Sequence, residues 1–139
     1  MNNKYGTQIE IQKYGKLYDE IGRKMPFIDL YTAISKDEPK LGILPSWEIF
    51  KSIVATYCNL CGINYPRTGE GRQIFLIDVA ANIDCDTDKL IIYRALRARN
   101  AIAHSLDNGV KPAWKDSESL LDSAVRLLSI SKQIKSPSE

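Results

Sequence analysis

The chain has 139 residues, of which 44% are hydrophobic and 26% charged, as in an ordinary globular protein. This length predicts one domain over residues 1–139. The formal net charge of +2 is too small to indicate a nucleic-acid-binding protein, so any affinity for RNA requires locally clustered charge. No apolar run approaches the roughly 20 residues of a membrane span, and the N-terminus lacks a signal-peptide core. We therefore expect a cytoplasmic protein with no membrane partner.

Apolar residues recur at helical spacing along most of the chain, with turn-forming residues between the periodic segments. The segment 73–83 could be a buried strand by composition, but its alanines and the lack of other strand candidates favour a helix. The periodic segments are residues 8–24, 27–34, 45–61, 73–83, 86–104 and 116–130. Four to five helices with mostly short links predict an all-α fold, an antiparallel (up-and-down) bundle.

The links and capping residues can be predicted as well. Residues 36–42 have the charge, proline and glycine content of a loop, and Ser46 is suited to cap the following helix. A second loop, residues 64–72, carries two arginines. The best candidates to cap the last two helices are Asp86 or Thr87 for one, and Asp116 or Ser117 for the other.

The three cysteines argue against a disulfide framework, because their number is odd and no export signal is present. Cys58 and Cys61 form a C-x-x-C pair, and Cys85 and His104 would complete a set of four possible metal ligands. The pair lies inside an apolar helical pattern, however. We therefore expect two buried thiols on one helix face and no metal site.

The segment from Arg94 to His104 contains the densest run of arginines and the only histidine. On a helix, Tyr93, Arg94, Arg97, Asn100 and His104 share one polar side. Arg99 falls about 140° from His104, inside an apolar arc formed by Ile91, Ile92, Ala95, Leu96, Ala98, Ile102 and Ala103.

A guanidinium is costly to bury unpaired, so the position of Arg99 needs an explanation. Three remain open: a carboxylate such as Asp78 pairs with it, the helix bends there, or the apolar arc faces a partner protein.

The run Arg99-Asn100-Ala101-Ile102-Ala103-His104 resembles the R-x4-6-H motif of the HEPN superfamily, in its common form Arg-Asn-x-x-Ala-His. The resemblance is close over these six residues and extends loosely, through the helical pattern, over most of the chain. It implies a HEPN-like bundle acting as a metal-independent endoribonuclease without cofactors. Such proteins belong to toxin–antitoxin, phage-defence and RNA-processing systems, so an antitoxin or other neutralising partner is a possible binding protein.

Related toxins often carry a tyrosine two residues after the histidine, a position occupied here by Leu106. Modification of such a tyrosine by a partner is therefore not expected.

Cleavage of RNA by its own 2′-hydroxyl needs a base, an acid and a cation that balances the charge on phosphorus. Histidine changes its charge between pH 5 and 8, and the guanidinium fork matches phosphate oxygens. On the resemblance, His104 is the base or acid, Arg99 the phosphate clamp, and Asn100 a group that orients His104 or the phosphate.

The remaining arginines are predicted to hold the RNA backbone. Arg94 and Arg97 would contact flanking phosphates from the helix, and Arg67 and Arg72 from the loop 64–72. Because the reaction needs two proton-transfer groups and the chain has one histidine, we also expect a homodimer with a shared cleft. The alternatives are a non-catalytic bundle that binds RNA, a nucleotide or a protein, and a purely structural oligomerising bundle.

Overall fold

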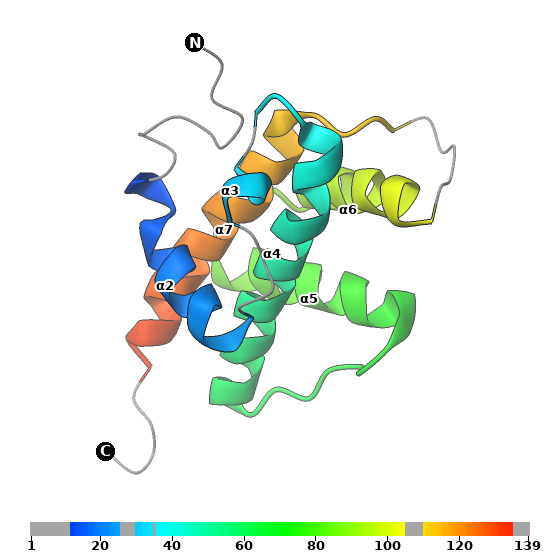
Figure 1. Cartoon of the computed structure of the whole chain (residues 1–139). Coiled ribbons are helices and arrows are strands. Elements are labelled where there is room, and N and C mark those ends of the chain that lie inside the picture. Colours follow the sequence, from blue (N-terminus) through cyan, green and yellow to red (C-terminus); the bar gives the residue numbers. More distant parts are fainter. Residues whose placement is uncertain (1–11, 26–29, 35, 105–109, 135–139) are drawn as a thin grey trace.

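The computed structural model describes residues 12–25, 30–34, 36–104 and 110–134, and every regular element among them is a helix. The prediction of an all-α helical bundle is confirmed, but the predicted antiparallel order does not hold for the two longest helices, which run in the same direction (Figure 1). The starts of the first two predicted helices (8–11 and 27–29) lie outside the described residues, as do residues 105–109, which include Leu106, and residues 135–139. The helices are α2 (Gly15–Lys24), α3 (Leu30–Ala33), α4 (Pro39–Cys61), α5 (Gly69–Ile83), α6 (Lys89–Ala103) and α7 (Trp114–Lys132).

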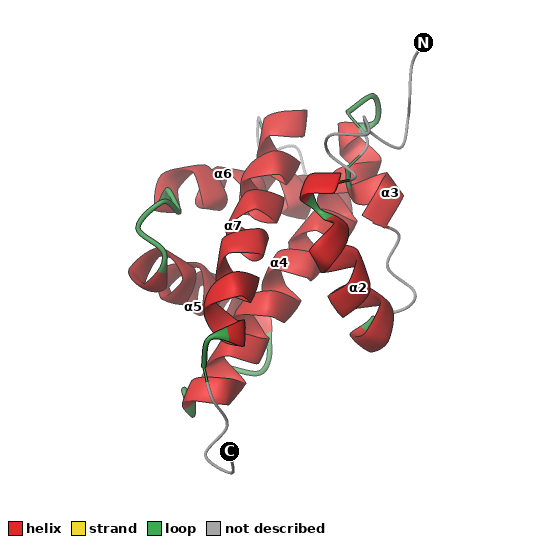
Figure 2. Ribbon diagram, turned by 90° about the vertical axis from the view of Figure 1, so that its left-hand side faces the viewer, coloured by secondary structure: helices red, strands yellow, loops and turns green. Residues whose placement is uncertain are grey.

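The two longest helices, α4 with 23 residues and α7 with 19, form the centre of the molecule. They run in the same direction, with α2 packed on α7 and α3 on α4 (Figure 1). Helices α5 and α6 form an antiparallel pair that lies across α4 and α7 (Figures 1 and 2). This α5–α6 pair carries most of the residues expected in the functional site.

Helix α4 supplies much of the core. Trp47 and Phe50 are fully buried and their ring centroids lie 5.4 Å apart. Each buried aromatic side chain removes a large apolar area from water. Leu60, in the last turn of α4, is exposed.

The predicted loop at 36–42 and the helix start at residues 45–46 are wrong, because α4 begins at Pro39. Pro39 suits this start, because a proline in the first helical turn loses no hydrogen bond: the first N–H groups have no acceptor in the helix. Since the helix starts earlier than predicted, Pro45 lies inside α4. Ser46 does not cap the helix: its buried hydroxyl donates to the Gly42 carbonyl at 2.7 Å, with the Ala33 carbonyl 3.2 Å away.

Gly42 is the point of closest approach between α3 and α4. A Cβ atom built on it would lie 2.8 Å from the Thr32 carbonyl oxygen and 3.1 Å from that of Ala33. Real Cβ atoms do not approach backbone oxygens so closely. The sequence therefore needs glycine here for space, and the local pattern alone does not reveal this.

The predicted caps of the last two helices are each displaced. Asp88 caps α6, its Oδ1 accepting from the backbone N–H groups of Leu90 at 3.0 Å and Ile91 at 3.4 Å. Helix α7 begins at Trp114, so Asp116 is its third residue and accepts from the Ala113 N–H at 2.9 Å. In both cases a carboxylate satisfies first-turn donors, as expected, but from a neighbouring position.

Candidate functional site

Helix α6 carries the predicted catalytic residues, and its first half is fixed to α5. The Tyr93 hydroxyl donates to Asp78 Oδ1 at 2.8 Å, and Lys89 Nζ lies 2.9 Å from the same oxygen. The hydrogen bond from Lys89 lowers the pKa of Asp78, with partial burial opposing this and the Tyr93 hydroxyl adding to it. Asp78 is therefore engaged by Lys89 and Tyr93. The suggestion that it pairs with Arg99 is wrong.

Arg99 lies inside the apolar arc, as expected, and its side chain is 18% exposed. Its Nη2 is 3.8 Å from Glu48 Oε1 on α4, and its Nη1 donates to Asn100 Oδ1 at 2.9 Å. Glu48 is shared, since Lys51 Nζ lies 2.8 Å from its other carboxylate oxygen. Of the three explanations for the position of Arg99, the structure shows the first, with Glu48 as the carboxylate.

The apolar arc packs within the chain itself. Ile92, Ala95, Leu96 and Ala98 are all buried against the rest of the bundle. The rest of the arc is less covered, since Ile91 and Ile102 are half-buried and Ala103 is exposed.

His104 is exposed and follows the last residue of α6, as predicted. Its backbone N–H donates to the Asn100 carbonyl at 3.0 Å. Asn100 therefore contacts both predicted catalytic residues, with its side chain on Arg99 and its backbone on His104. The side-chain oxygen of Asn100 accepts from Arg99 and orients it. The prediction was that Asn100 would orient His104 or the phosphate.

The two flanking arginines of α6 differ in their surroundings. Arg97 is exposed. Arg94 Nε lies 3.6 Å from Oδ1 of Asp116, which is buried at the start of α7. Arg94 therefore helps to join α6 to α7, in addition to any contact that it makes with a ligand.

The predicted loop 64–72 is too long, because α5 begins at Gly69 and contains Arg72. The antiparallel α5–α6 pair brings Arg67 and Arg72 to the same end as the α6 residues. Asp78 in the middle of α5 faces Lys89 and Tyr93 in the first half of α6, so the start of α5 lies beside the end of α6 (Figure 1). Arg67 and Arg72 flank that start. The structure thus gathers at one end residues that are distant in sequence.

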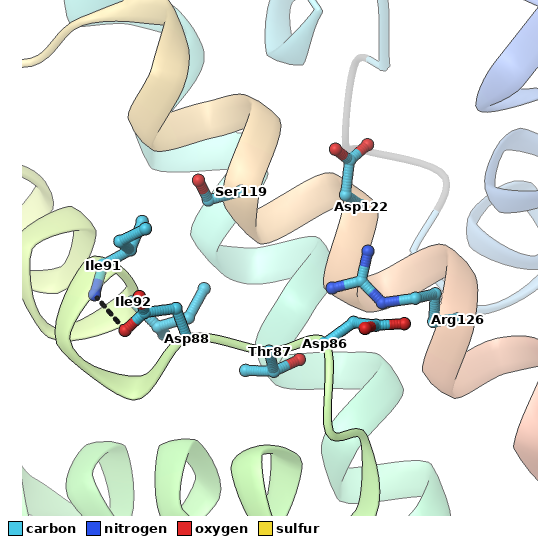
Figure 3. Close-up of a pocket in the computed structure, with 8 residues that line it drawn as sticks. All are labelled: Asp86, Thr87, Asp88, Ile91, Ile92, Ser119, Asp122 and Arg126. Atoms are coloured by element: carbon cyan, nitrogen blue, oxygen red, sulfur yellow. Dashed lines mark hydrogen bonds between the residues drawn. The ribbon is translucent and has the colours of Figure 1, made fainter.

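A small polar pocket lies toward the other end of α6, beside the loop 84–88 and α7 (Figure 3). Figure 3 shows the Asp88 carboxylate turned back to the Ile91 N–H, as a cap. The volume of about 140 Å³ is well below the several hundred Å³ of typical ligand sites. The lining residues are Asp86, Thr87, Asp88, Ile91, Ile92, Ser119, Asp122 and Arg126.

The polar groups around this pocket serve the fold. Arg126 Nε donates to Oδ2 of the buried Asp84 at 2.6 Å, and the Thr87 hydroxyl donates to the same oxygen at 2.8 Å. Burial opposes the charge on Asp84, but the bonds from Arg126, Thr87 and the Asp86 N–H outweigh it and lower its pKa. These bonds fix the loop between α5 and α6, which makes the pocket a structural feature.

The prediction of two buried thiols is half wrong. Cys58 is buried, and that burial, with the nearby Cys61 sulfur, raises its pKa. Cys61 is exposed because it ends α4, and Cys85 is exposed in the loop after α5. Within the part of the chain that the structure covers, no three metal-binding side chains come together.

None of the helices in the described ranges combines the length and apolar character needed to cross a bilayer. Comparisons with known protein families, with curated proteins and with solved structures found no match to this chain.

Proposed function

We propose that this chain is a metal-independent endoribonuclease of the HEPN type, with Arg99, Asn100 and His104 as its site. The observation that carries the proposal is the side-chain hydrogen bond from Arg99 Nη1 to Asn100 Oδ1, which holds the guanidinium of the proposed phosphate clamp. The exposed His104 directly follows the last residue of the same helix. The sequence resemblance to the Arg-Asn-x-x-Ala-His motif supports the same assignment.

The reaction that these groups suit is transfer within the RNA. A base takes the proton of the 2′-hydroxyl, O2′ bonds to phosphorus, and the bond from phosphorus to O5′ breaks. An acid protonates O5′, which gives a 2′,3′-cyclic phosphate and a 5′-hydroxyl. His104 supplies one of the two proton transfers, and the Arg99 fork balances the charge on the non-bridging oxygens.

The second proton-transfer group is proposed to be His104 of a second copy. The chain has a single histidine, and lysine or tyrosine side chains ordinarily titrate near pH 10. A two-fold contact would bring the same helix end of each chain into one cleft. The supporting observation is that His104 is exposed at the end of α6 and thus accessible to another chain.

One observation favours a second function, a non-catalytic bundle that binds RNA, a nucleotide or a protein. Arg99 is largely buried and already has a carboxylate within 3.8 Å, as an arginine with a structural role would have. In that case the exposed arginines on α6 and in the loop before α5 form the contact surface.

Cleavage of RNA in the presence of EDTA separates the two functions. Arg99→Ala and His104→Ala are each expected to lower the rate about 100-fold or more while the protein stays folded. Arg23→Ala is the matched control, because it removes an exposed arginine from α2, distant from α6 (Figure 1). Full activity in either site variant, or a strict need for a divalent metal, would contradict the proposal.

A further inference from the structure

Two arginines gather around one tyrosine ring at the start of α5: Arg67 lies in the loop before the helix and Arg72 in its first turn. The guanidinium carbons of Arg67 and Arg72 lie 4.8 and 5.9 Å from the centroid of the Tyr65 ring. Arg67 Nη1 is 3.4 Å from the Tyr65 hydroxyl, and Arg72 Nη1 donates to the Arg67 carbonyl at 3.2 Å. Tyr65, Arg67 and Arg72 thus form one unit, the Tyr65 cluster.

The positive charge of the Tyr65 cluster is not neutralised by the side chains that the structure describes. No ion pair within 4.0 Å joins Arg67 or Arg72 to a described carboxylate, whereas Arg94, Arg99 and Arg126 each have one. A guanidinium over an aromatic face keeps its full charge and most of its donors. With respect to the described side chains, the cluster therefore has N–H donors left for an anion.

The cluster is also held in place before any ligand binds. The Tyr65 ring is half-buried and packs against the core, and Arg72 Nε is shielded from solvent. Such anchoring lowers the entropy lost when the arginines bind a ligand. The Thr68 side chain does not cap the adjacent start of α5.

We infer that the Tyr65 cluster is a phosphate-binding subsite for an RNA strand, with Tyr65 as its positioning residue. The inference rests on the proposed function, since the strand would continue to Arg99 and His104 at the same end of the α5–α6 pair (Figure 1). The guanidinium faces are occupied by the tyrosine ring, so the N–H groups at their edges would contact backbone phosphate. Such contacts bind RNA without distinguishing its bases.

Binding of a labelled single-stranded RNA oligonucleotide to the non-cleaving His104→Ala chain tests this, by fluorescence anisotropy over a range of salt concentrations. Replacing both Arg67 and Arg72 by alanine should weaken binding at least ~10-fold at low salt. It should also make the slope of log affinity against log salt shallower by about 1 to 1.5, since each phosphate contact contributes about 0.7 on single strands. A matched Lys16→Ala/Arg23→Ala variant removes the same charge from α2 and should leave the slope unchanged.

The role of the ring is tested with both arginines in place. Tyr65→Leu should lose part of the affinity and of the slope, while Tyr65→Phe, which keeps the ring, should bind within ~2-fold of the parent. The helical circular dichroism of each variant checks that a loss is not caused by unfolding.

An unchanged slope in the double-arginine variant would overturn the subsite. So would displacement of the RNA by micromolar AMP, which indicates a site for a free nucleotide. These results are independent of cleavage, because they use a chain that does not cut. If the double-arginine variant has a shallower slope but the wild-type protein does not cleave RNA, the subsite is supported and the proposed endoribonuclease activity is contradicted.

Discussion

Arg99 on α6 and Glu48 on α4 lie with Nη2 and Oε1 3.8 Å apart, so the proposed phosphate clamp is held by a carboxylate of the central helix. A phosphate must compete with Glu48 for the same guanidinium. Lys51, 2.8 Å from the other Glu48 oxygen, offsets part of the carboxylate charge. This arrangement keeps a partly buried cation paired while leaving it able to exchange partners.

Glu48→Gln is accordingly expected to strengthen RNA binding. Removing the competing charge should raise the affinity of the His104→Ala chain for an RNA oligonucleotide by about 2- to 5-fold, the size of a partly exposed ion pair. Anisotropy at constant salt measures this. Glu118→Gln removes a carboxylate from α7 as a control, and equal affinities for the two variants would contradict competition at Arg99.

If two chains share one cleft, an inactive chain should inactivate the wild-type chain with which it forms a dimer. If each cleft needs His104 from both chains, adding equal His104→Ala chain should lower the rate per wild-type chain to about one half. A nine-fold excess should lower it to about one tenth. Sedimentation of the same samples gives the mass. The composite site would be excluded by a monomer that still cuts RNA. It would also be excluded if the rate per wild-type chain did not change when the His104→Ala chain is added.

The lowered pKa of Asp84 predicts that the folded protein loses stability in acid. Its pKa is lowered in the folded state, so its contribution is present above its unfolded value of about 4 and is lost as the pH falls through the lower folded value. Asp78 and Glu20 also have lowered pKa values and act in the same direction.

Asp84→Asn should therefore cost about 1–3 kcal/mol at pH 7 and reduce the difference in stability between pH 7 and pH 3. Urea unfolding at both pH values measures this. Asp86→Asn, an exposed neighbour in the same loop, is the control. If the two variants show the same acid sensitivity as wild type, the Asp84–Arg126 bond contributes little.

Two glycines should respond oppositely to alanine. Gly42→Ala forces a Cβ against two α3 carbonyls and should destabilise the fold by about 1–3 kcal/mol. Gly22 lies in α2 with no atom within 4 Å of an added Cβ, so Gly22→Ala should stabilise by about 0.5–1 kcal/mol. Thermal unfolding compares them, and a harmless Gly42→Ala would mean that α3 and α4 can separate there.

The sequence alone determined the helical class and the faces of α6. Periodicity along a helix is a local property, so the burial of Ala95 and Ala98, the exposure of Arg97 and the position of Arg99 within the apolar arc could all be predicted. The exposed His104 at the end of α6 followed from the same reasoning.

Only the tertiary structure decided which residues meet across helices. Glu48, not Asp78, pairs with Arg99, because α4 passes beside the second half of α6 while Asp78 faces its first half. The close approach of α3 to Gly42 of α4 is likewise contained in no local pattern. The gathering of Arg67 and Arg72 near the end of α6 depends on the antiparallel packing of α5 and α6, since the helical repeat sets the faces of one helix and never its neighbours.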